Sequence, residues 1–165
     1  MIWITGLSSA GKSTVATSLA QRLGDDGIKP VVLDGDTMRS LLPCPLGYGL
    51  DDRRRLATSY ADLAGELAAQ GHVVIVATVS LLHDVHARNR RVLPRYLEVF
   101  LDVPEAVRTQ RDTRGIYTMD QSVGVDLPAQ LPTAPDLAIA NHGTTTPQDC
   151  ATLIARLLEE RWDGR

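Results

Sequence analysis

The sequence predicts an α/β domain with a mainly parallel sheet of five strands and right-handed crossover connections. Three observations lead to this prediction. Short apolar runs alternate along the chain with segments whose apolar residues recur at helical spacing. The run at residues 72–79 is almost continuously β-branched, which is typical of a central parallel strand buried on both faces. A glycine-rich segment, residues 6–14, joins the first apolar run to the first helical pattern.

The individual elements follow from these patterns. We expect strands at residues 1–5, 29–33, 72–79, 96–102 and 137–140. We expect helices at residues 12–23, 37–42, 51–70, 80–91, 104–111 and 147–162. Asp36 is well placed to cap the second helix. Residues 112–135 are rich in Gly, Pro, Thr and Asp, and a loop of that length is usually a lid or a substrate loop.

Size and composition narrow the class of protein. The 165 residues fit a single domain, residues 1–165, with 44% hydrophobic and 22% charged residues, which is ordinary for a globular protein. The formal net charge of -3 gives no global reason to expect nucleic acid or an anionic membrane as a partner. No apolar run approaches the ~20 residues that span a bilayer. Cys44 and Cys150 follow no metal or redox spacing, so we expect reduced thiols in a cytoplasmic protein.

Residues 6–14 match the phosphate-binding loop pattern G-x-x-x-x-G-K-[ST] at every fixed position. Glycines permit backbone conformations and close approaches that a Cβ would obstruct, and the loop amides with the helix N-terminus then face phosphate oxygens. Lys12 supplies a positive charge to the β- and γ-phosphates, and the Ser13 hydroxyl can bind Mg2+. The sequence therefore predicts that ATP or another nucleoside triphosphate binds to Gly6, Ser8, Ser9, Ala10, Gly11, Lys12, Ser13 and Thr14.

Open α/β sheets bind ligands at the carboxyl ends of their strands, where the loop, Asp34 with Asp36, and Ser80 are expected to meet. Asp36 is the candidate for orienting an acceptor hydroxyl and accepting its proton, and Asp34 is a candidate metal-side or positioning group. Both acids could instead simply cap the following helix.

Several arginines are candidates for binding anions. Arg39 lies one helical step after Asp36, so both can face one cleft. Arg53, Arg54 and Arg55 open a helix, where the macrodipole disfavours cations; an anionic substrate and a solvated helix start explain this run equally well.

The remaining polar candidates lie later in the chain. Arg111 and Arg114 begin the predicted lid, where they could reach ATP phosphates or form plain surface ion pairs. His83 and His86 complete no metal spacing, and we expect surface histidines there.

Together these segments resemble the adenylylsulfate kinases, in an order kept from residue 1 to about residue 135. The phosphate loop alone is shared by many kinases, whereas Asp-Gly-Asp-x-x-Arg combined with Arg-Asp-x-x-Gly-x-Tyr is far more specific. The resemblance is carried by residues 6–14, 34–36 with Arg39, 46–48 with 52–53, Gly71, 98–104, 111–117 and 124–126.

The resemblance implies a P-loop kinase-like, three-layer α/β/α fold, ATP and Mg2+ as cofactors, and often a homodimer. It implies transfer of the ATP γ-phosphate to the 3′-hydroxyl of adenosine 5′-phosphosulfate (APS), which gives PAPS for sulfate assimilation. Asp36 falls on the catalytic aspartate, and Lys12 assists at the phosphates. The expected substrate-binding residues are Asp34, Asp36, Arg39, Tyr48, Arg53 and Ser80, with Tyr48 stacking on the substrate adenine.

Parts of the acceptor region differ from the family pattern. Leu56 stands where an asparagine is expected, residues 80–83 read Ser-Leu-Leu-His instead of Ser-Pro-x-Arg, and residues 117–124 contain no lysine. Two alternatives therefore stay open. One is a related kinase that acts on the hydroxyl of another nucleotide-like or specialised metabolite, and the other is a non-catalytic nucleotide-binding module.

Overall fold

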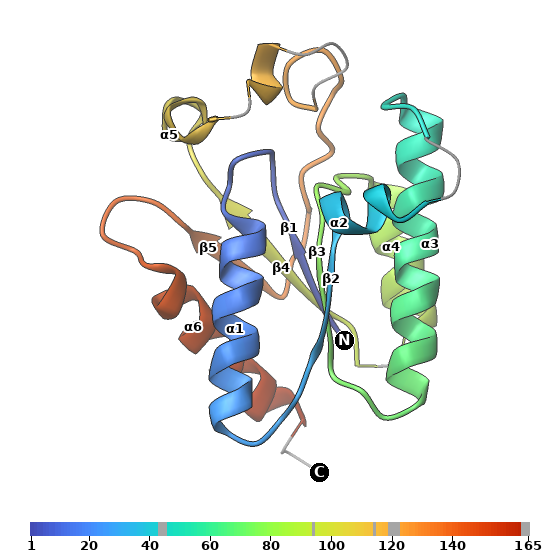
Figure 1. The fold of residues 1–165 in the computed structure, drawn as a ribbon, viewed down its shortest axis with the longest axis vertical. Coiled ribbons are helices and arrows are strands. Elements are labelled where there is room, and N and C mark those ends of the chain that lie inside the picture. The colour runs from blue at the N-terminus through green and yellow to red at the C-terminus, as the bar shows by residue number, and fades with distance from the viewer. Residues whose placement is uncertain (43–45, 94, 114, 119–122, 163–165) are drawn as a thin grey trace.

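The structure, a computed structural model, describes residues 1–42, 46–93, 95–113, 115–118 and 123–162. Its five strands form one parallel sheet in the order β2-β3-β1-β4-β5 (Figure 1). They are β1 (Ile2–Thr5), β2 (Val31–Asp34), β3 (Val74–Ala77), β4 (Leu97–Asp102) and β5 (Leu137–Ala140). The predicted five-stranded α/β fold is confirmed, and all of the strand pairs are parallel. Cys44 and Arg114 lie outside the described residues.

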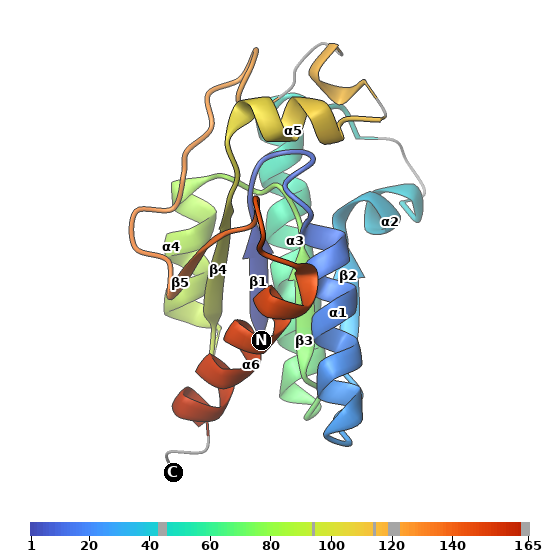
Figure 2. The ribbon, with the colours of Figure 1, turned by 90° about the vertical axis from the view of Figure 1, so that its left-hand side faces the viewer.

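Helices cover both faces of the sheet, which makes three layers (Figures 1 and 2). Helices α1 and α6 pack together on one face, and α3 and α4 lie on the other. The helices are α1 (Lys12–Asp25), α2 (Gly35–Ser40), α3 (Leu50–Ala69), α4 (His83–Val92), α5 (Glu105–Arg111) and α6 (Pro147–Trp162). None of the helices in the described part of the chain is long and apolar enough to cross a membrane.

Each face of the sheet has its own apolar core. Ile4, Leu19 and Ile154 belong to the core under α1 and α6, and all three are completely buried. Trp3, Tyr60 and Val76 belong to the core under α3. Alternate residues of β1 thus point to opposite cores, which explains why Ile2, Trp3 and Ile4 are all apolar.

Several predicted boundaries differ from the observed ones. Helix α2 starts at Gly35 and is capped by Asp34, not by Asp36, because the Asp34 carboxylate accepts hydrogen bonds from the amides of Asp36 and Thr37, both at 3.1 Å. The predicted lid contains the short 3-10 helix η1 (Ile116–Thr118) and a bridge between Val123 and Leu127, so the described part of it is not structureless.

Candidate active site

The phosphate loop connects β1 to α1, and its two glycines are required by close contacts. A Cβ at Gly6 would lie 2.8 Å from the carbonyl oxygen of Leu101. Gly11 has a φ of +89°, and a Cβ there would lie 2.7 Å from Nδ2 of Asn141. Both distances are far inside van der Waals contact. The loop therefore sits tightly against β4 and the chain after β5.

The side chains of Lys12 and Ser13 are held at the start of α1. Lys12 Nζ donates a hydrogen bond to the carbonyl oxygen of Leu7 at 2.8 Å, so the ammonium group folds back over the loop. Ser13 Oγ donates to Asp34 Oδ2 at 2.5 Å, which links α1 to the end of β2.

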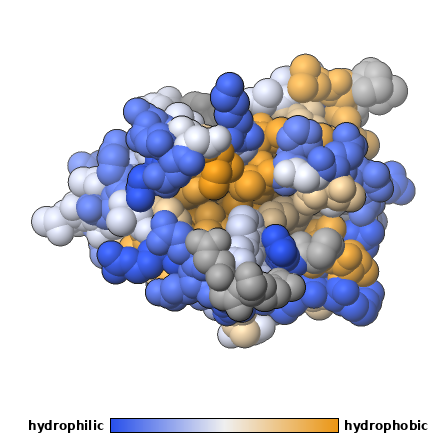
Figure 3. Space-filling view, turned by 90° about the horizontal axis from the view of Figure 1, so that it is seen from below, coloured by the Kyte–Doolittle hydropathy of each residue, from blue (hydrophilic) through white to orange (hydrophobic). Residues whose placement is uncertain are grey.

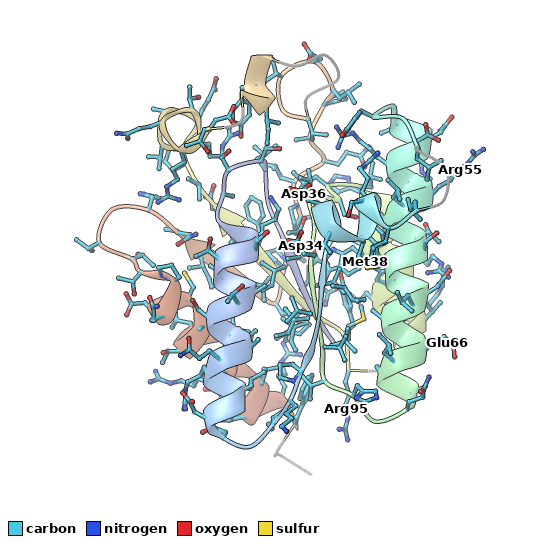
Figure 4. The ribbon with its side chains drawn as sticks, viewed as in Figure 1. Asp34, Asp36, Met38, Arg55, Glu66 and Arg95 are labelled. Carbon is cyan, nitrogen blue, oxygen red and sulfur yellow. The ribbon has the colours of Figure 1, made fainter. Side chains whose placement is uncertain are left out.

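Asp34 and Asp36 lie together at the start of α2, close to the first turn of α1 (Figure 4). Burial alone would raise the pKa of the Asp34 carboxyl, but hydrogen bonds from Ser13, Thr37 and Asp36 outweigh burial and lower it. Asp34 is thus kept ionised as a cap and as a partner of Ser13. The Asp36 side chain is exposed toward the same space.

A cavity of about 640 Å³ opens at the carboxyl ends of the strands and gathers most of the predicted site residues. Ala10 is completely buried behind the loop, and neither Ala10 nor Gly6 lines the cavity. The role predicted for Arg114 falls outside the described residues. The predicted residues that do line the cavity are Ser8, Ser9, Gly11, Lys12, Ser13, Thr14, Asp34, Asp36, Arg39, Tyr48, Arg53, Ser80 and Arg111.

Two arginines and a tyrosine form a cationic corner of this cavity. The Arg39 guanidinium carbon lies 4.4 Å from the centre of the Tyr48 ring, and that of Arg53 lies 5.7 Å from it. Arg39 also donates to the carbonyl groups of Leu46 and Gly47, and Arg53 donates to that of Tyr48. Burial, and next the positive charge of Arg39, lower the pKa of Arg53. An anion bound between the two guanidinium groups would relieve this repulsion.

The three consecutive arginines of α3 have different surroundings. Arg53 lines the cavity, whereas Arg54 pairs with Asp84 at 2.7 Å on the surface. Arg55 projects from the outer side of α3 (Figure 4), with its side chain 74% exposed. Only the first of the three can therefore contact a ligand in the cavity.

Ser80 lines the cavity in an unusual backbone conformation, with a φ of +20°. Its buried hydroxyl has no hydrogen-bond partner among the described residues. Its carbonyl oxygen lies 2.6 Å from Nε2 of His86, and Nδ1 of His86 lies 3.3 Å from Glu98. The prediction of surface histidines is therefore right for His83, which is exposed, and wrong for His86, whose side chain is 7% exposed.

Apolar side chains form one wall of the cavity, and sequence reasoning missed them because such residues are usually core. They come from α3, from the chain after β3 and from the predicted lid. Tyr60 joins this wall, and its hydroxyl donates to the carbonyl group of Gly35 at 3.3 Å. The apolar members are Leu50, Leu56, Ala57, Val79, Leu81, Leu82, Ile116, Val123, Leu127 and Pro128.

The opposite side of the cavity holds Arg111 at the end of α5. Its guanidinium group donates to the carbonyl oxygen of Asn141 at 3.0 Å. Asn141, which follows β5, is 4% exposed and was not predicted as part of the site. Its side-chain amide donates to the carbonyl oxygen of Ala10 at 2.8 Å, so it reaches the phosphate loop from behind. A single asparagine after a short strand gives no signal in the sequence.

The side-chain oxygen atoms near the phosphate loop suit a Mg2+ ion that also binds phosphate and water. They do not form a site that would hold a metal by protein ligands alone. No three His, Cys, Asp or Glu side chains cluster as a metal site within the described residues. The Ser13 hydroxyl and the Asp34 carboxylate are adjacent hard oxygen ligands. Mg2+ commonly binds through one or two such groups together with water and phosphate oxygens.

Comparison with known proteins shows what the chain as a whole is similar to. The family model described as adenylylsulphate kinase matches residues 1–140. The adenylyl-sulfate kinase of Burkholderia ambifaria is 35% identical over 95% of this chain and 91% of the relative. That of Chloroflexus aurantiacus is 34% identical over 99% of this chain and 90% of the relative. The structure of the Mycobacterium tuberculosis APS kinase in complex with AMPPNP and APS superposes with a TM-score of 0.88 at 34% identity, covering 96% of both chains.

Proposed function

The chain belongs to the adenylylsulfate kinase family, and we propose that it transfers the γ-phosphate of ATP to the 3′-hydroxyl of APS, which gives PAPS and ADP. As a member of this family it is an ATP-dependent kinase. The observation that carries the proposal is that Asp36, Arg39 and Arg53 line the same cavity as the phosphate loop. A donor site and an anion-binding acceptor site thus face each other.

On the donor side, the chain supplies charge and directed hydrogen-bond donors. We assign the loop amides and Lys12 to the β- and γ-phosphates, where negative charge increases as the P–O bond of ATP breaks. Lys12 already lies over the loop, bonded to the Leu7 carbonyl, and its flexible side chain can exchange that partner for a phosphate oxygen. Arg111, at the edge of the cavity, is assigned to the nucleotide.

On the acceptor side, we assign Asp36 as the group that orients the 3′-hydroxyl and accepts its proton as the new O–P bond forms. The proton passes to Asp36, and the electron pair of the broken bond stays on the β-phosphate oxygen of ADP. Arg39 and Arg53 are assigned to the anionic part of APS, and Tyr48, 56% exposed, to a stacking contact with its adenine.

We also propose that Mg2+ accompanies ATP, held by the Ser13 hydroxyl with Asp34 acting directly or through water. When bound, the ion neutralises phosphate charge and orients the γ-phosphate. The lowered pKa of Asp34 supports this assignment, because an ionised carboxylate is the form that attracts a divalent cation.

The proposal is tested by incubating the purified chain with ATP, Mg2+ and a panel of hydroxyl acceptors that includes APS. We expect ADP release above an acceptor-free blank, together with PAPS identified by chromatography. Release of ADP without PAPS, or no acceptor-dependent release with APS, would refute the assignment. A Mg2+ titration after chelation tests the metal in the same assay.

A second acceptor is worth including because of the apolar wall. Leu56 and Ala57 line the acceptor side of the cavity and are nearly completely buried. Because their side chains are apolar, they cannot hydrogen-bond to a sugar or a base. A related kinase for a nucleotide-like or specialised metabolite with an apolar part would use this wall. Higher kcat/KM with such a compound than with APS would favour this alternative.

Finally, we propose that the chain forms a homodimer and works in the cytoplasm. Figure 3 shows an apolar area bordered by hydrophilic residues on the face at the amino ends of the strands. Among the exposed large apolar side chains are Ile28, Val32 and Leu63. Light scattering coupled to size-exclusion chromatography would test the dimer, and a monomeric mass at micromolar concentration would exclude it.

A further inference from the structure

Two residues to which no role has been assigned so far donate hydrogen bonds to carbonyl groups of the phosphate loop. A peptide unit is planar, so the carbonyl of one residue and the N–H of the next point in opposite directions. Fixing the carbonyl groups of Ser8 and Ala10 on the outer side of the loop therefore orients the amides of Ser9 and Gly11 the other way. In this loop both carbonyl groups accept hydrogen bonds from distant side chains.

Tyr117 holds the first of these carbonyl groups. Its hydroxyl donates to the carbonyl oxygen of Ser8 at 2.5 Å and accepts a hydrogen bond from Arg108. A guanidinium group can only donate, so the single hydroxyl proton of Tyr117 is directed to Ser8. Arg108 is itself fixed, since it is 6% exposed and donates to the carbonyl of Val103 at 3.0 Å.

Asn141 holds the second carbonyl group. Its Nδ2 donates to the carbonyl oxygen of Ala10 at 2.8 Å, and its Oδ1 accepts from Cys150 Sγ at 3.4 Å. These two contacts determine which way the buried amide points. The amide also fills the space beside Gly11 that a Cβ would need.

We propose that Tyr117 and Asn141 are positioning residues that hold the phosphate loop from its outer side in the conformation that binds ATP phosphates. The inference rests on the proposed use of ATP at this site. The two residues come from different parts of the chain, one from η1 and one from the turn after β5. Both must therefore be in place for the loop amides to converge.

The test is the substitution Tyr117→Phe, which removes only the hydroxyl. We expect the Kd for AMPPNP and the KM for ATP to rise about three- to tenfold, the value of one hydrogen bond, with the KM for the acceptor unchanged. Tyr96→Phe is the matched control, because it removes a hydroxyl bonded to Glu98 at 3.3 Å near the amino end of β4. The control should bind AMPPNP like the unmodified chain.

Asn141→Ala provides a second, independent readout and should also raise the Kd for AMPPNP. Unchanged nucleotide affinity in both variants would overturn the proposal, and so would equal increases in the KM for ATP and for the acceptor, since these indicate a general structural role. If the unmodified chain bound AMPPNP but phosphorylated no acceptor, the proposed function would fail while this inference could still be measured.

Discussion

Nε2 of His86 lies 2.6 Å from the carbonyl oxygen of Ser80, and this contact links α4 to the wall of the cavity. A carbonyl oxygen only accepts hydrogen bonds, so Nε2 must carry the proton. Nδ1 of His86 lies 3.3 Å from a carboxylate oxygen of Glu98, so it faces Glu98 with a lone pair when His86 is neutral and with an N–H when His86 is protonated. The imidazole supports the positive-φ conformation of Ser80 from behind.

The buried imidazole predicts a specific pH dependence of stability. Burial lowers the pKa of His86 from 6.5, although Glu98 and the Ser80 carbonyl act in the opposite direction, and His83 and Arg90 add to the lowering. Below about pH 6.5 the unfolded chain then binds more protons than the folded chain, so the free energy of unfolding falls as the pH falls toward the folded pKa.

Urea unfolding between about pH 5 and 8 measures this dependence, with His86→Asn as the comparison. We expect the unmodified chain to lose more stability on acidification than the variant does. His72→Asn is the control, because His72 is exposed and does not contribute to the lowered pKa of His86. Parallel stability profiles for the unmodified chain and His86→Asn would contradict the prediction.

The second prediction concerns the arginines of α3. Arg53→Ala should raise the KM for the acceptor about ten- to a hundredfold, because a hydrogen bond between charged groups is worth about 1.5–3 kcal/mol. The KM for ATP should change little. Arg55→Ala, two positions along the helix, removes the same charge from a side chain that is 74% exposed and should leave both KM values nearly unchanged. Equal effects of the two substitutions would show that only net charge matters.

The donor half of the site could be predicted from sequence because its chemistry is local. Gly6, Gly11, Lys12 and Ser13 lie within one short segment, and their spacing alone specifies a phosphate loop. The parallel sheet was predictable for a similar reason, because a β-branched apolar run such as 72–79 is typical of a buried central strand.

The acceptor half and the supporting contacts depend on long-range packing, which the sequence alone does not reveal. The buried position of His86 depends on Glu98 and Ser80, and that of Asn141 depends on Ala10. Asp34, rather than Asp36, caps α2 because β2 ends one residue before the helix begins. Both aspartates fit the capping pattern in the sequence, and only the path of the backbone shows which of the two is the cap.

The third prediction assigns the chemical step to Asp36. Asp36→Asn keeps the size of the side chain but removes its ability to accept a proton. We expect kcat to fall about a hundred- to ten-thousandfold, with the Kd for AMPPNP nearly unchanged. Asp25→Asn, at the far end of α1, is an exposed control for the loss of one negative charge. A normal kcat in Asp36→Asn would remove the residue from the mechanism.

The last prediction compares glycines near the two ends of α1. Gly11→Ala places a methyl group 2.7 Å from Asn141 Nδ2 and forces alanine into a φ of +89°, which alone costs about 1–2 kcal/mol. We therefore expect a lower Tm and weaker AMPPNP binding. Gly24→Ala meets nothing within 4 Å and lies within α1, so it should stabilise the chain by about 0.5–1 kcal/mol. Thermal unfolding with and without AMPPNP measures both effects, and the opposite signs are the expected outcome. Changes of the same sign would mean that the contact between Gly11 and Asn141 does not restrict the phosphate loop.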